Sequence, residues 1–175
     1  MPSEPVAELH EAFSSPGASA TSWTDTRSHL EAAEIYWVST VRPDGRPHVT
    51  PVVGVYVDGS SYFTTGSGEQ KAKNLTANPQ CVLATGCNAL HEGLDVVVEG
   101  KVQRITEASK LQRIADAFEA KYGSEWHFDV RDDAFAGEGG KANVFEVVPA
   151  KTFAYSRGAE YAATRFRFAR DRGRS

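Results

Sequence analysis

Short runs of β-branched and aromatic residues, separated by tight-turn sequences, constrain the fold of this chain more than any other feature. Three such runs cover residues 35–42, 48–57 and 61–65. The first two are joined by Pro-Asp-Gly-Arg at 43–46, and the second and third by Asp-Gly at 58–59. Proline fixes φ and glycine tolerates positive φ, so both connections are typical of hairpin turns. The three runs therefore predict an antiparallel meander.

The remaining runs of this kind extend the predicted sheet. They predict further strands at residues 80–85, 94–105, 143–148, 152–156 and 164–168. Gly100 suggests a bulge or a close backbone approach, and Pro149 is expected to separate two strands. Residues 124–141 are expected to form an acidic, glycine-containing loop. Many strands linked by hairpins argue for a closed antiparallel barrel.

Few helices are expected. The clearest covers residues 107–122, where apolar side chains recur at three- and four-residue intervals and Gly123 ends the pattern. Shorter helices are predicted at 25–34, with Thr24 as the N-cap, and at 69–77. The fold class is therefore mainly β, with a few short helices and one longer amphipathic helix.

Length and composition predict one domain. The chain has 175 residues, of which 41% are hydrophobic, enough for a single core and too little for two. Residues 1–22 mix proline, serine, glycine and alanine without periodicity, so we expect a flexible N-terminal arm there. Residues 23–170 are expected to form the barrel domain, and residues 171–175 a basic tail.

Charge and cysteine content narrow the possible functions. The formal net charge is -4, which argues against nucleic-acid binding, although arginines gather between residues 165 and 174. Cys81 and Cys87 lack CxxC or metal-ligand spacing, which favours a reduced, cytoplasmic protein. No apolar run approaches the length of a membrane span, and the first residues lack the order of a secretion signal, so we expect no membrane partner.

The motif with the most chemical content is a predicted strand that runs through a glycine turn into a helix, at residues 62–75. Gly66 and Gly68 leave backbone N–H groups uncovered where the helix presents the positive end of its dipole. The accompanying hydroxyl and ammonium groups belong to Thr64, Thr65, Ser67, Lys71 and Lys73. Such convergence of donors is typical of a phosphate site. The alternative is a surface turn before an ordinary helix.

Three segments, in this order, resemble the pyridoxamine 5'-phosphate oxidase-like superfamily. They are Trp-Val-Ser-Thr-Val-Arg-Pro-Asp-Gly-Arg-Pro-His-Val-Thr-Pro-Val at 37–52, Tyr-Phe-Thr-Thr-Gly at 62–66, and Lys-Ala-Lys-Asn-Leu followed by Asn-Pro at 71–79. Within the superfamily, the chain is most similar to the split-barrel flavin- and deazaflavin-dependent oxidoreductases of actinobacteria. The resemblance covers residues 35–168.

The resemblance implies a split β-barrel homodimer that holds one cofactor in each of two grooves at the subunit interface. The strand at 48–52 would lie along the cofactor ring, which assigns to the ring Thr50, Pro51 and Val52. The segment at 64–74 would hold the cofactor phosphate, which assigns to that site Thr64, Thr65, Gly66, Ser67, Lys71, Lys73 and Asn74. For Asn74, an ordinary place on the helix surface is the alternative. Arg165 and Arg167 would neutralise cofactor or substrate charge across the dimer, or else belong to a basic tail that faces solvent.

Two cofactors fit such a scaffold, FMN and the deazaflavin coenzyme F420. They share the ring shape and the ribityl phosphate, but the deazaflavin moves hydride and reacts poorly with oxygen, whereas FMN also passes single electrons. Glu69 and Gln70 stand where relatives that bind the deazaflavin carry basic residues, which weakens the case for F420. The Lys-x-Lys-Asn-Leu pattern and the ending at 164–168 favour the deazaflavin.

We therefore expect an oxidoreductase that passes hydride from reduced F420 or FMN to a planar conjugated small molecule. The sequence identifies no dedicated acid or base, since His48 and His91 stand alone. Trp126 and His127 could line the substrate side of the groove, with core or interface packing as their alternative role. The alternative function is non-catalytic binding of a flavin, a deazaflavin or haem. Pyridoxamine 5'-phosphate oxidation is a third possibility, opposed by the lack of that enzyme's longer C-terminal segment.

Overall fold

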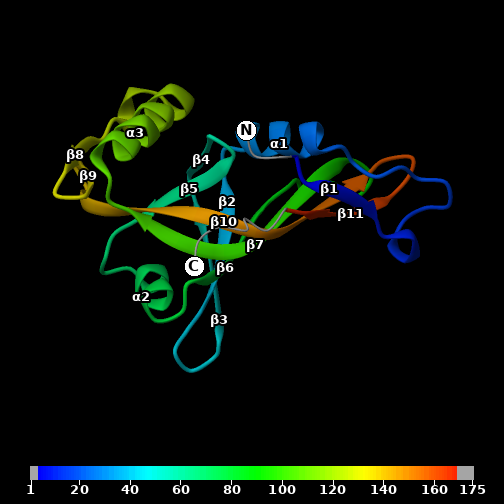
Figure 1. Ribbon diagram of the computed structural model, residues 1–175, viewed down its shortest axis with the longest axis horizontal. Helices are drawn as coiled ribbons and strands as arrows, with labels where there is room; N and C mark the ends of the chain where they lie inside the picture. Colours follow the sequence, from blue (N-terminus) through cyan, green and yellow to red (C-terminus); the bar gives the residue numbers. More distant parts are fainter. Residues whose placement is uncertain (1–3, 169–175) are drawn as a thin grey trace.

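The structure, a computed structural model, describes residues 4–168. Its strands join in one sheet in the order β1-β11-β10-β7-β6-β2-β3, with β4, β5, β8 and β9 attached off this path (Figure 1). The strands are β1 (Val6–Leu9), β2 (Tyr36–Val41), β3 (Pro47–Val52), β4 (Gly54–Val57), β5 (Ser60–Thr65), β6 (Gln80–Thr85), β7 (Gly93–Ile105), β8 (Asp129–Arg131), β9 (Ala134–Gly137), β10 (Gly140–Arg157) and β11 (Ala162–Arg167). The helices are α1 (Trp23–Ala32), α2 (Gln70–Ala77) and α3 (Ala108–Tyr122), with 3-10 turns η1 (Glu11–Phe13) and η2 (Ser124–Trp126). The mainly β fold class is confirmed.

Strand β10 holds the sheet together, because its 18 residues pair with β5, β7, β9 and β11. The expected break at Pro149 is wrong, since the strand continues there through a register shift between Pro149 and Lys151. The shift lies beside Gly100, where an added Cβ would be 2.2 Å from the Val148 carbonyl oxygen. The close backbone approach expected at Gly100 is therefore confirmed, and it lets two predicted strands become one.

Residues 48–57, predicted as one strand, form two strands in different parts of the sheet. β3 pairs with β2, whereas β4 pairs with β5. The chain passes from one hairpin to the next at Gly54, where an added Cβ would lie 2.8 Å from the Tyr62 carbonyl oxygen and 3.2 Å from the Tyr36 ring. β3 is consequently an edge strand, and the β2–β3 hairpin projects from the body of the molecule (Figure 1).

Part of the N-terminal arm belongs to the sheet, which differs from the expectation of a loosely held segment. β1 pairs with β11 as an edge strand, with Glu8 opposite Arg165. Beyond β1, the backbone N–H of Ser15 donates to the Tyr161 carbonyl oxygen at 2.8 Å, and that of Thr21 to the Thr164 hydroxyl at 2.9 Å. The arm was missed because its few apolar residues gain their partners only from the far end of the chain. The predicted basic tail at 171–175 lies outside the described residues.

Two hydrophobic clusters form the core. One fills the barrel and contains Tyr36, Val38, Phe63, Leu83 and Phe145. The other lies beneath α3, whose apolar stripe of Leu111, Ile114, Ala115 and Phe118 is buried as the spacing predicted. α3 ends at Gly123 with a φ of 93°, which confirms the predicted stop.

Two local predictions need correction. The N-cap of α1 is Ser22 rather than Thr24, because the Ser22 hydroxyl accepts a hydrogen bond from the Asp25 N–H at 3.0 Å. The expected loop at 124–141 contains η2 and the β8–β9 hairpin. Phe128 and Phe135 stack there at 4.8 Å between ring centroids, and Phe118 of α3 contacts both edge-on. Burial of these rings against α3 gives this otherwise polar segment its structure.

Within residues 4–168, no helix has both the length and the apolar character needed to cross a bilayer. The same residues contain no group of three or more His, Cys, Asp or Glu side chains arranged to hold a metal ion. Cys81 is buried and Cys87 exposed, and both are free thiols. Burial raises the pKa of the Cys81 thiol to about 12, which disfavours its reactive thiolate form at neutral pH.

Candidate functional site

The glycine turn lies where the sequence placed it, between the end of β5 at Thr65 and the start of α2 at Gln70. Glu69 occupies the N-cap position of α2, but its side chain makes no capping hydrogen bond. Its carboxylate turns back instead, where Oε1 accepts a hydrogen bond from the Gly66 N–H at 2.8 Å and Oε2 pairs with the Lys71 ammonium. Two of the predicted donors, the Gly66 N–H and the Lys71 ammonium, therefore meet at one anion, the carboxylate of Glu69.

The environment of this carboxylate keeps it ionised. Partial burial pushes the pKa of Glu69 upward, but hydrogen bonds from Lys71 and the Gly66 N–H outweigh burial, and the pKa falls below that of an ordinary glutamate. Lys71 is only 7% exposed, which is unusual for a lysine. The buried Lys71 ammonium and the Gly66 N–H are both donors and both contact the same carboxylate. A buried cation of this kind needs a negatively charged partner.

The other residues predicted around the turn are spread over several environments. Thr65 is buried, with its hydroxyl 3.3 Å from the Gly66 carbonyl oxygen, and Thr64 is half-buried. Ser67 and Lys73 are exposed. The turn thus presents one buried lysine, one backbone N–H and nearby hydroxyls, while Lys73 points to solvent on the other side of α2 from the core.

Asn74 lies inside the molecule, so the alternative place on the helix surface is wrong. It is fully buried. Its side-chain NH₂ donates to the Thr40 hydroxyl of β2 at 2.9 Å, and its carbonyl oxygen accepts from the Gln70 side chain at 2.8 Å. The bond to Thr40 fixes α2 against the sheet, whereas the bond from Gln70 lies within α2. Asn74 therefore helps to set the position of the glycine turn.

Strand β3 contributes the residues predicted to contact a cofactor ring. Thr50 is half-buried and Pro51 is exposed, whereas Val52 turns inward to the barrel core. Because β3 is an edge strand, the backbone on its outer side is available for hydrogen bonds to a ligand. Pro51 has no N–H and can offer only its carbonyl oxygen there.

Arg165 lies far from the glycine turn within one chain. It is on β11, at the opposite end of the sheet from α2 (Figure 1). Its guanidinium pairs with Glu8 of β1 at 2.6 Å, and Arg167 pairs with the same carboxylate at 3.0 Å. Arg165 also borders a small hollow of about 260 Å³ with His10 and Phe13. A single chain therefore does not bring Arg165 to the anion site.

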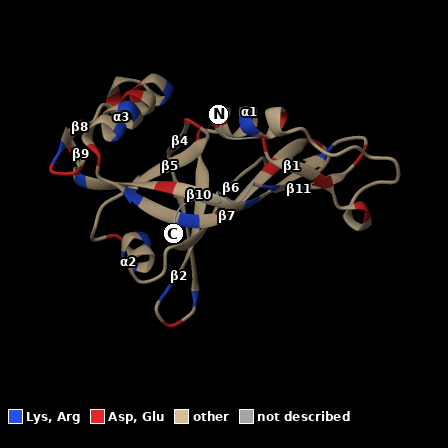
Figure 2. Cartoon of the chain, in the orientation of Figure 1, with Lys and Arg blue, Asp and Glu red and all other residues tan. Residues whose placement is uncertain are grey.

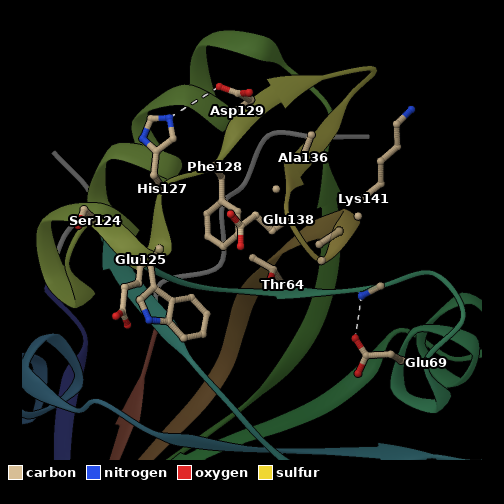
Figure 3. A pocket seen from close by; sticks show the side chains of 16 residues that line it. Thr64, Glu69, Ser124, Glu125, His127, Phe128, Asp129, Ala136, Glu138 and Lys141 are labelled. Atoms are coloured by element: carbon tan, nitrogen blue, oxygen red, sulfur yellow. Dashed lines mark hydrogen bonds and ion pairs between the residues drawn. The ribbon is translucent and has the colours of Figure 1, made fainter.

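The anion site opens onto a large groove, with a volume of about 1040 Å³ (Figure 3). One wall is the glycine turn, represented by Thr64, Gly66 and Glu69, and the other walls are residues 124–129 and 136–142. Aromatic surface comes from Trp126 and Phe128, and His127 also lines this groove. The place of Trp126 and His127 on the substrate side of an interface groove stays a prediction. Phe128 and the residues of 136–142 were not predicted, because that segment was expected to be an irregular loop.

A pattern in the sequence could have found this wall. Phe128, Val130 and Phe135 flank the pair Asp132 and Asp133, which have positive φ values of 50° and 57°. Aspartates tolerate this conformation, which is that of a tight hairpin turn. The alternation of apolar and polar residues on either side of the pair is a weak hairpin signal.

Negative charge exceeds positive charge in the groove. Its lining includes the carboxylates of Glu69, Glu125, Asp129 and Glu138. The basic residues of the lining are Lys141 and His127, and Lys141 is already paired with Asp132. The chain as a whole carries both signs close together, as Figure 2 shows around α3 and the β8–β9 hairpin. The groove therefore has a local surplus of negative charge.

His127 is the titratable group of the groove with the best-defined partners. Its Nδ1 lies 2.7 Å from Glu119, and its Nε2 lies 3.7 Å from Asp129. The hydrogen bond with Glu119 raises the pKa of His127 above that of an ordinary histidine. His127 thus remains protonated at higher pH than a free imidazole.

Known proteins share this architecture. A solved structure of a conserved hypothetical protein from Mycobacterium tuberculosis is 19% identical and covers 78% of this chain and 85% of its own, with a TM-score of 0.63. An FAD-binding protein from Mycobacterium smegmatis is 16% identical, over 85% and 98% of the two chains, with a TM-score of 0.55. A haem-binding protein from Mycobacterium smegmatis is 13% identical over 79% of this chain, which spans 55% of that protein, with a TM-score of 0.63. These identities show the shared fold alone.

No curated protein matches the chain in sequence. A family model described as pyridoxamine 5'-phosphate oxidase matches residues 24–155, well over half of the chain. The matched segment includes β2, β3, β5 and α2, on which the resemblance in sequence was recognised. The chain therefore belongs to the pyridoxamine 5'-phosphate oxidase-like family and has its split-barrel fold.

Proposed function

We propose that the protein is an oxidoreductase that uses a phosphorylated flavin-type cofactor to reduce a planar conjugated small molecule. The observation that carries the proposal is the anion site formed by Lys71 and the Gly66 N–H, which opens onto an aromatic-lined groove. Membership of a flavin-binding family and the likeness to an FAD-binding fold support the same class of ligand.

The residues of the glycine turn fit a phosphate group, because they already hold a carboxylate. Lys71, the Gly66 N–H and the Thr65 and Ser67 hydroxyls would hold the cofactor phosphate, and the backbone of β3 at Thr50 would lie along its ring. Both FMN and F420 carry a phosphate at this position. A longer acidic tail along the groove would meet the surplus of carboxylates there, so the charge of the groove favours FMN over F420.

A homodimer would complete the site. On the outer face of the sheet, strand pairing places in one row Pro51, Trp37, Ala84, Val97, Phe153 and Arg165. Trp37 is 50% exposed on this face, and Val49 beside it is 54% exposed. A large exposed apolar stripe is typical of an association surface. A two-fold axis parallel to the strands through the middle of the row would bring Arg165 of one copy to β3 of the other.

The chain's own residues would position the substrate and control water. Trp126 and Phe128 would stack on a planar acceptor, and the walls of the groove would exclude water from its other face. The bound reduced cofactor supplies a hydride, which carries two electrons to the acceptor. The proton that completes the reduction would come from water or from His127, whose pKa is raised mainly by the hydrogen bond with Glu119.

Cofactor titration and reoxidation kinetics test the proposal. Purified protein is titrated with FMN and with F420 while cofactor fluorescence is followed, and the reduced complex is then mixed with quinone-like acceptors in a stopped-flow instrument. We expect FMN to bind with a micromolar or lower Kd and its reoxidation by an acceptor to be faster than that of free reduced FMN. Failure of both cofactors to bind would contradict the proposal.

Non-catalytic binding of a flavin or of haem is the second candidate. It is favoured by the ion pairs of His127, the only histidine of the described lining, because Glu119 and Asp129 hold its ring nitrogens and would hinder proton transfer to a substrate. The likeness to a haem-binding fold supports the same class. Tight cofactor binding without accelerated reoxidation by any acceptor would favour this candidate over the oxidoreductase.

Sedimentation tests the dimer. Wild-type protein is expected to sediment as a dimer, and Trp37→Asp as a monomer, because the charge would be buried in the association surface. Leu90→Asp is the matched control, since Leu90 is also an exposed large apolar residue, at 71%, but lies in the loop between β6 and β7. A monomeric wild type, or an equal loss of dimer in both variants, would contradict the proposed interface.

A further inference from the structure

The carboxylate of Glu69 stands where the cofactor phosphate is proposed to bind. It accepts a hydrogen bond from the Gly66 N–H at 2.8 Å and forms the ion pair of Lys71. A phosphate at the glycine turn needs these same two donors. The Gly66 N–H is a single donor, and a phosphate beside the Glu69 carboxylate would set two negative charges against one ammonium. Glu69 and a phosphate therefore exclude each other from the Gly66 N–H and compete for Lys71.

Glu69 lies between the groove and Lys71. The Glu69 side chain is 50% exposed and lines the groove, whereas the Lys71 side chain is 8% exposed and does not line it. An anion that enters from the groove therefore meets the Glu69 carboxylate before it can reach Lys71. Displacement of Glu69 would open the groove side of the ammonium.

The contacts of Glu69 also differ from those of a side chain that caps a helix. As the N-cap residue of α2, Glu69 would stabilise the helix by accepting hydrogen bonds from the N–H groups of the first turn. It makes no such bond, and the contacts of its carboxylate are instead to Gly66, three residues earlier, and to the Lys71 ammonium. The carboxylate thus satisfies the anion site and leaves the helix end uncapped by its side chain.

We propose that Glu69 is an internal competitor of the cofactor phosphate and the residue that sets cofactor affinity at this site. The inference rests on the proposed function, because it takes the phosphate-bearing cofactor as the displacing ligand. When the phosphate binds, the Gly66 N–H and Lys71 exchange one acceptor for another, and the Glu69 carboxylate swings into the groove. The cofactor is therefore held less tightly than the donors alone would allow, and it remains exchangeable.

Calorimetric titration with FMN and with riboflavin tests the inference, because riboflavin has the same ring and no phosphate. Glu69→Gln keeps the size of the side chain and removes its charge. We expect it to bind FMN roughly ten- to a hundredfold more tightly than wild type, the effect of one charge-assisted hydrogen bond. Riboflavin affinity is expected to stay the same, which a general effect on folding or on access to the groove would not produce.

Glu138→Gln is the matched control. It removes one charge from the same groove at an exposed position, so any change in FMN affinity that it causes reports long-range charge alone. We expect that change to be a few-fold at most. An equal gain in Glu138→Gln and Glu69→Gln, or an equal gain for riboflavin and FMN, would overturn the inference.

The remaining outcomes separate the inference from the proposed function. Equal FMN affinity in wild type and Glu69→Gln overturns the inference and leaves the cofactor assignment standing, whereas no FMN binding by either protein overturns both. A second measurement uses wild type only and covers a failure of the variant to fold. Inorganic phosphate is titrated while the Gly66 amide resonance is followed by NMR, and we expect a saturable shift as the N–H changes acceptor. An unchanged Gly66 resonance overturns the inference.

Discussion

Among the ion pairs of the described residues, those at the start of α2 and at the β1–β11 edge differ in burial. At the start of α2, Glu69 pairs with Lys71, which is almost completely buried. At the β1–β11 edge, Glu8 pairs with Arg165 and Arg167, which are half-buried and exposed. The pKa of both carboxylates is lowered, that of Glu8 mainly by the hydrogen bond from Arg165.

This difference in burial indicates which of the two ion pairs can control ligand binding. Water can replace Glu8 around an exposed guanidinium at little cost. It cannot easily reach Lys71, so that lysine needs an anion from the protein or from a ligand. The buried pair is therefore expected to dominate both cofactor binding and local stability, and the following experiments examine that expectation.

Removal of the buried cation should have the largest effect. Lys71→Ala is expected to weaken FMN binding by roughly 1.5–3 kcal/mol, because a hydrogen bond to a charged group is lost. Lys73→Ala is the matched control, since Lys73 is an exposed lysine on the same helix. Fluorescence titration measures both Kd values. Equal Kd values for Lys71→Ala and wild type would remove Lys71 from the cofactor site.

Neutralisation of the buried pair's carboxylate should lower stability. Glu69→Gln is expected to reduce the free energy of unfolding by roughly 1–2 kcal/mol, because Lys71 keeps its charge and loses its partner, while the half-exposed position of Glu69 limits the loss. Urea unfolding followed by tryptophan fluorescence measures the change. An unaltered midpoint would show that water or another acceptor reaches Lys71 readily.

The same carboxylate should shape the acid limb of the stability curve. The pKa of Glu69 is lower in the folded protein than the ordinary value of 4.5, so its stabilising contribution is complete above that value and is lost as pH falls through the folded pKa. Urea midpoints of wild type and Glu69→Gln are therefore expected to converge as the pH is lowered below about 4.5. Parallel curves across this range would indicate that Glu69 does not titrate differently in the two states.

The exposed pair should show the smallest effect. Glu8→Gln is expected to leave the urea midpoint close to that of wild type, because solvent screens the interaction of Glu8 with Arg165 and Arg167. Measurement at low and high salt checks this, since any residual effect should shrink as salt is added. A loss as large as that of Glu69→Gln would mean that burial is not what distinguishes the two pairs.

Many elements of the fold were predicted correctly from interactions between residues close in sequence. The turns at Gly45 and Gly59 have the positive φ values, both 86°, that their Asp-Gly sequences require. The stripe on α3 and the strand–turn–helix motif at the glycine turn likewise follow from spacing within a few residues. Lys71 was predicted to bind a phosphate because it follows that turn, and the structure shows it buried and paired with Glu69.

Long-range contacts limited the rest. The β3–β4 corner depends on Gly54 meeting Tyr62, and the unbroken β10 depends on Gly100 meeting Val148, each across a gap in sequence. The strand β1 exists only because β11 offers its edge. Glu69 was noted only because relatives that bind the deazaflavin carry a basic residue at this position. Nothing in the neighbouring sequence indicated that its carboxylate would turn back to Gly66.

By itself, the sequence determined the mainly β class, the hairpin turns, the amphipathic helix and the place of the glycine turn, because these depend on backbone preferences and periodicity over short stretches. Only the tertiary structure decided which strands are edges, which half of the 48–57 segment joins which hairpin, and which anion the buried lysine holds. These outcomes depend on which distant segments pack together, and a side chain's partners are fixed only once that packing excludes water.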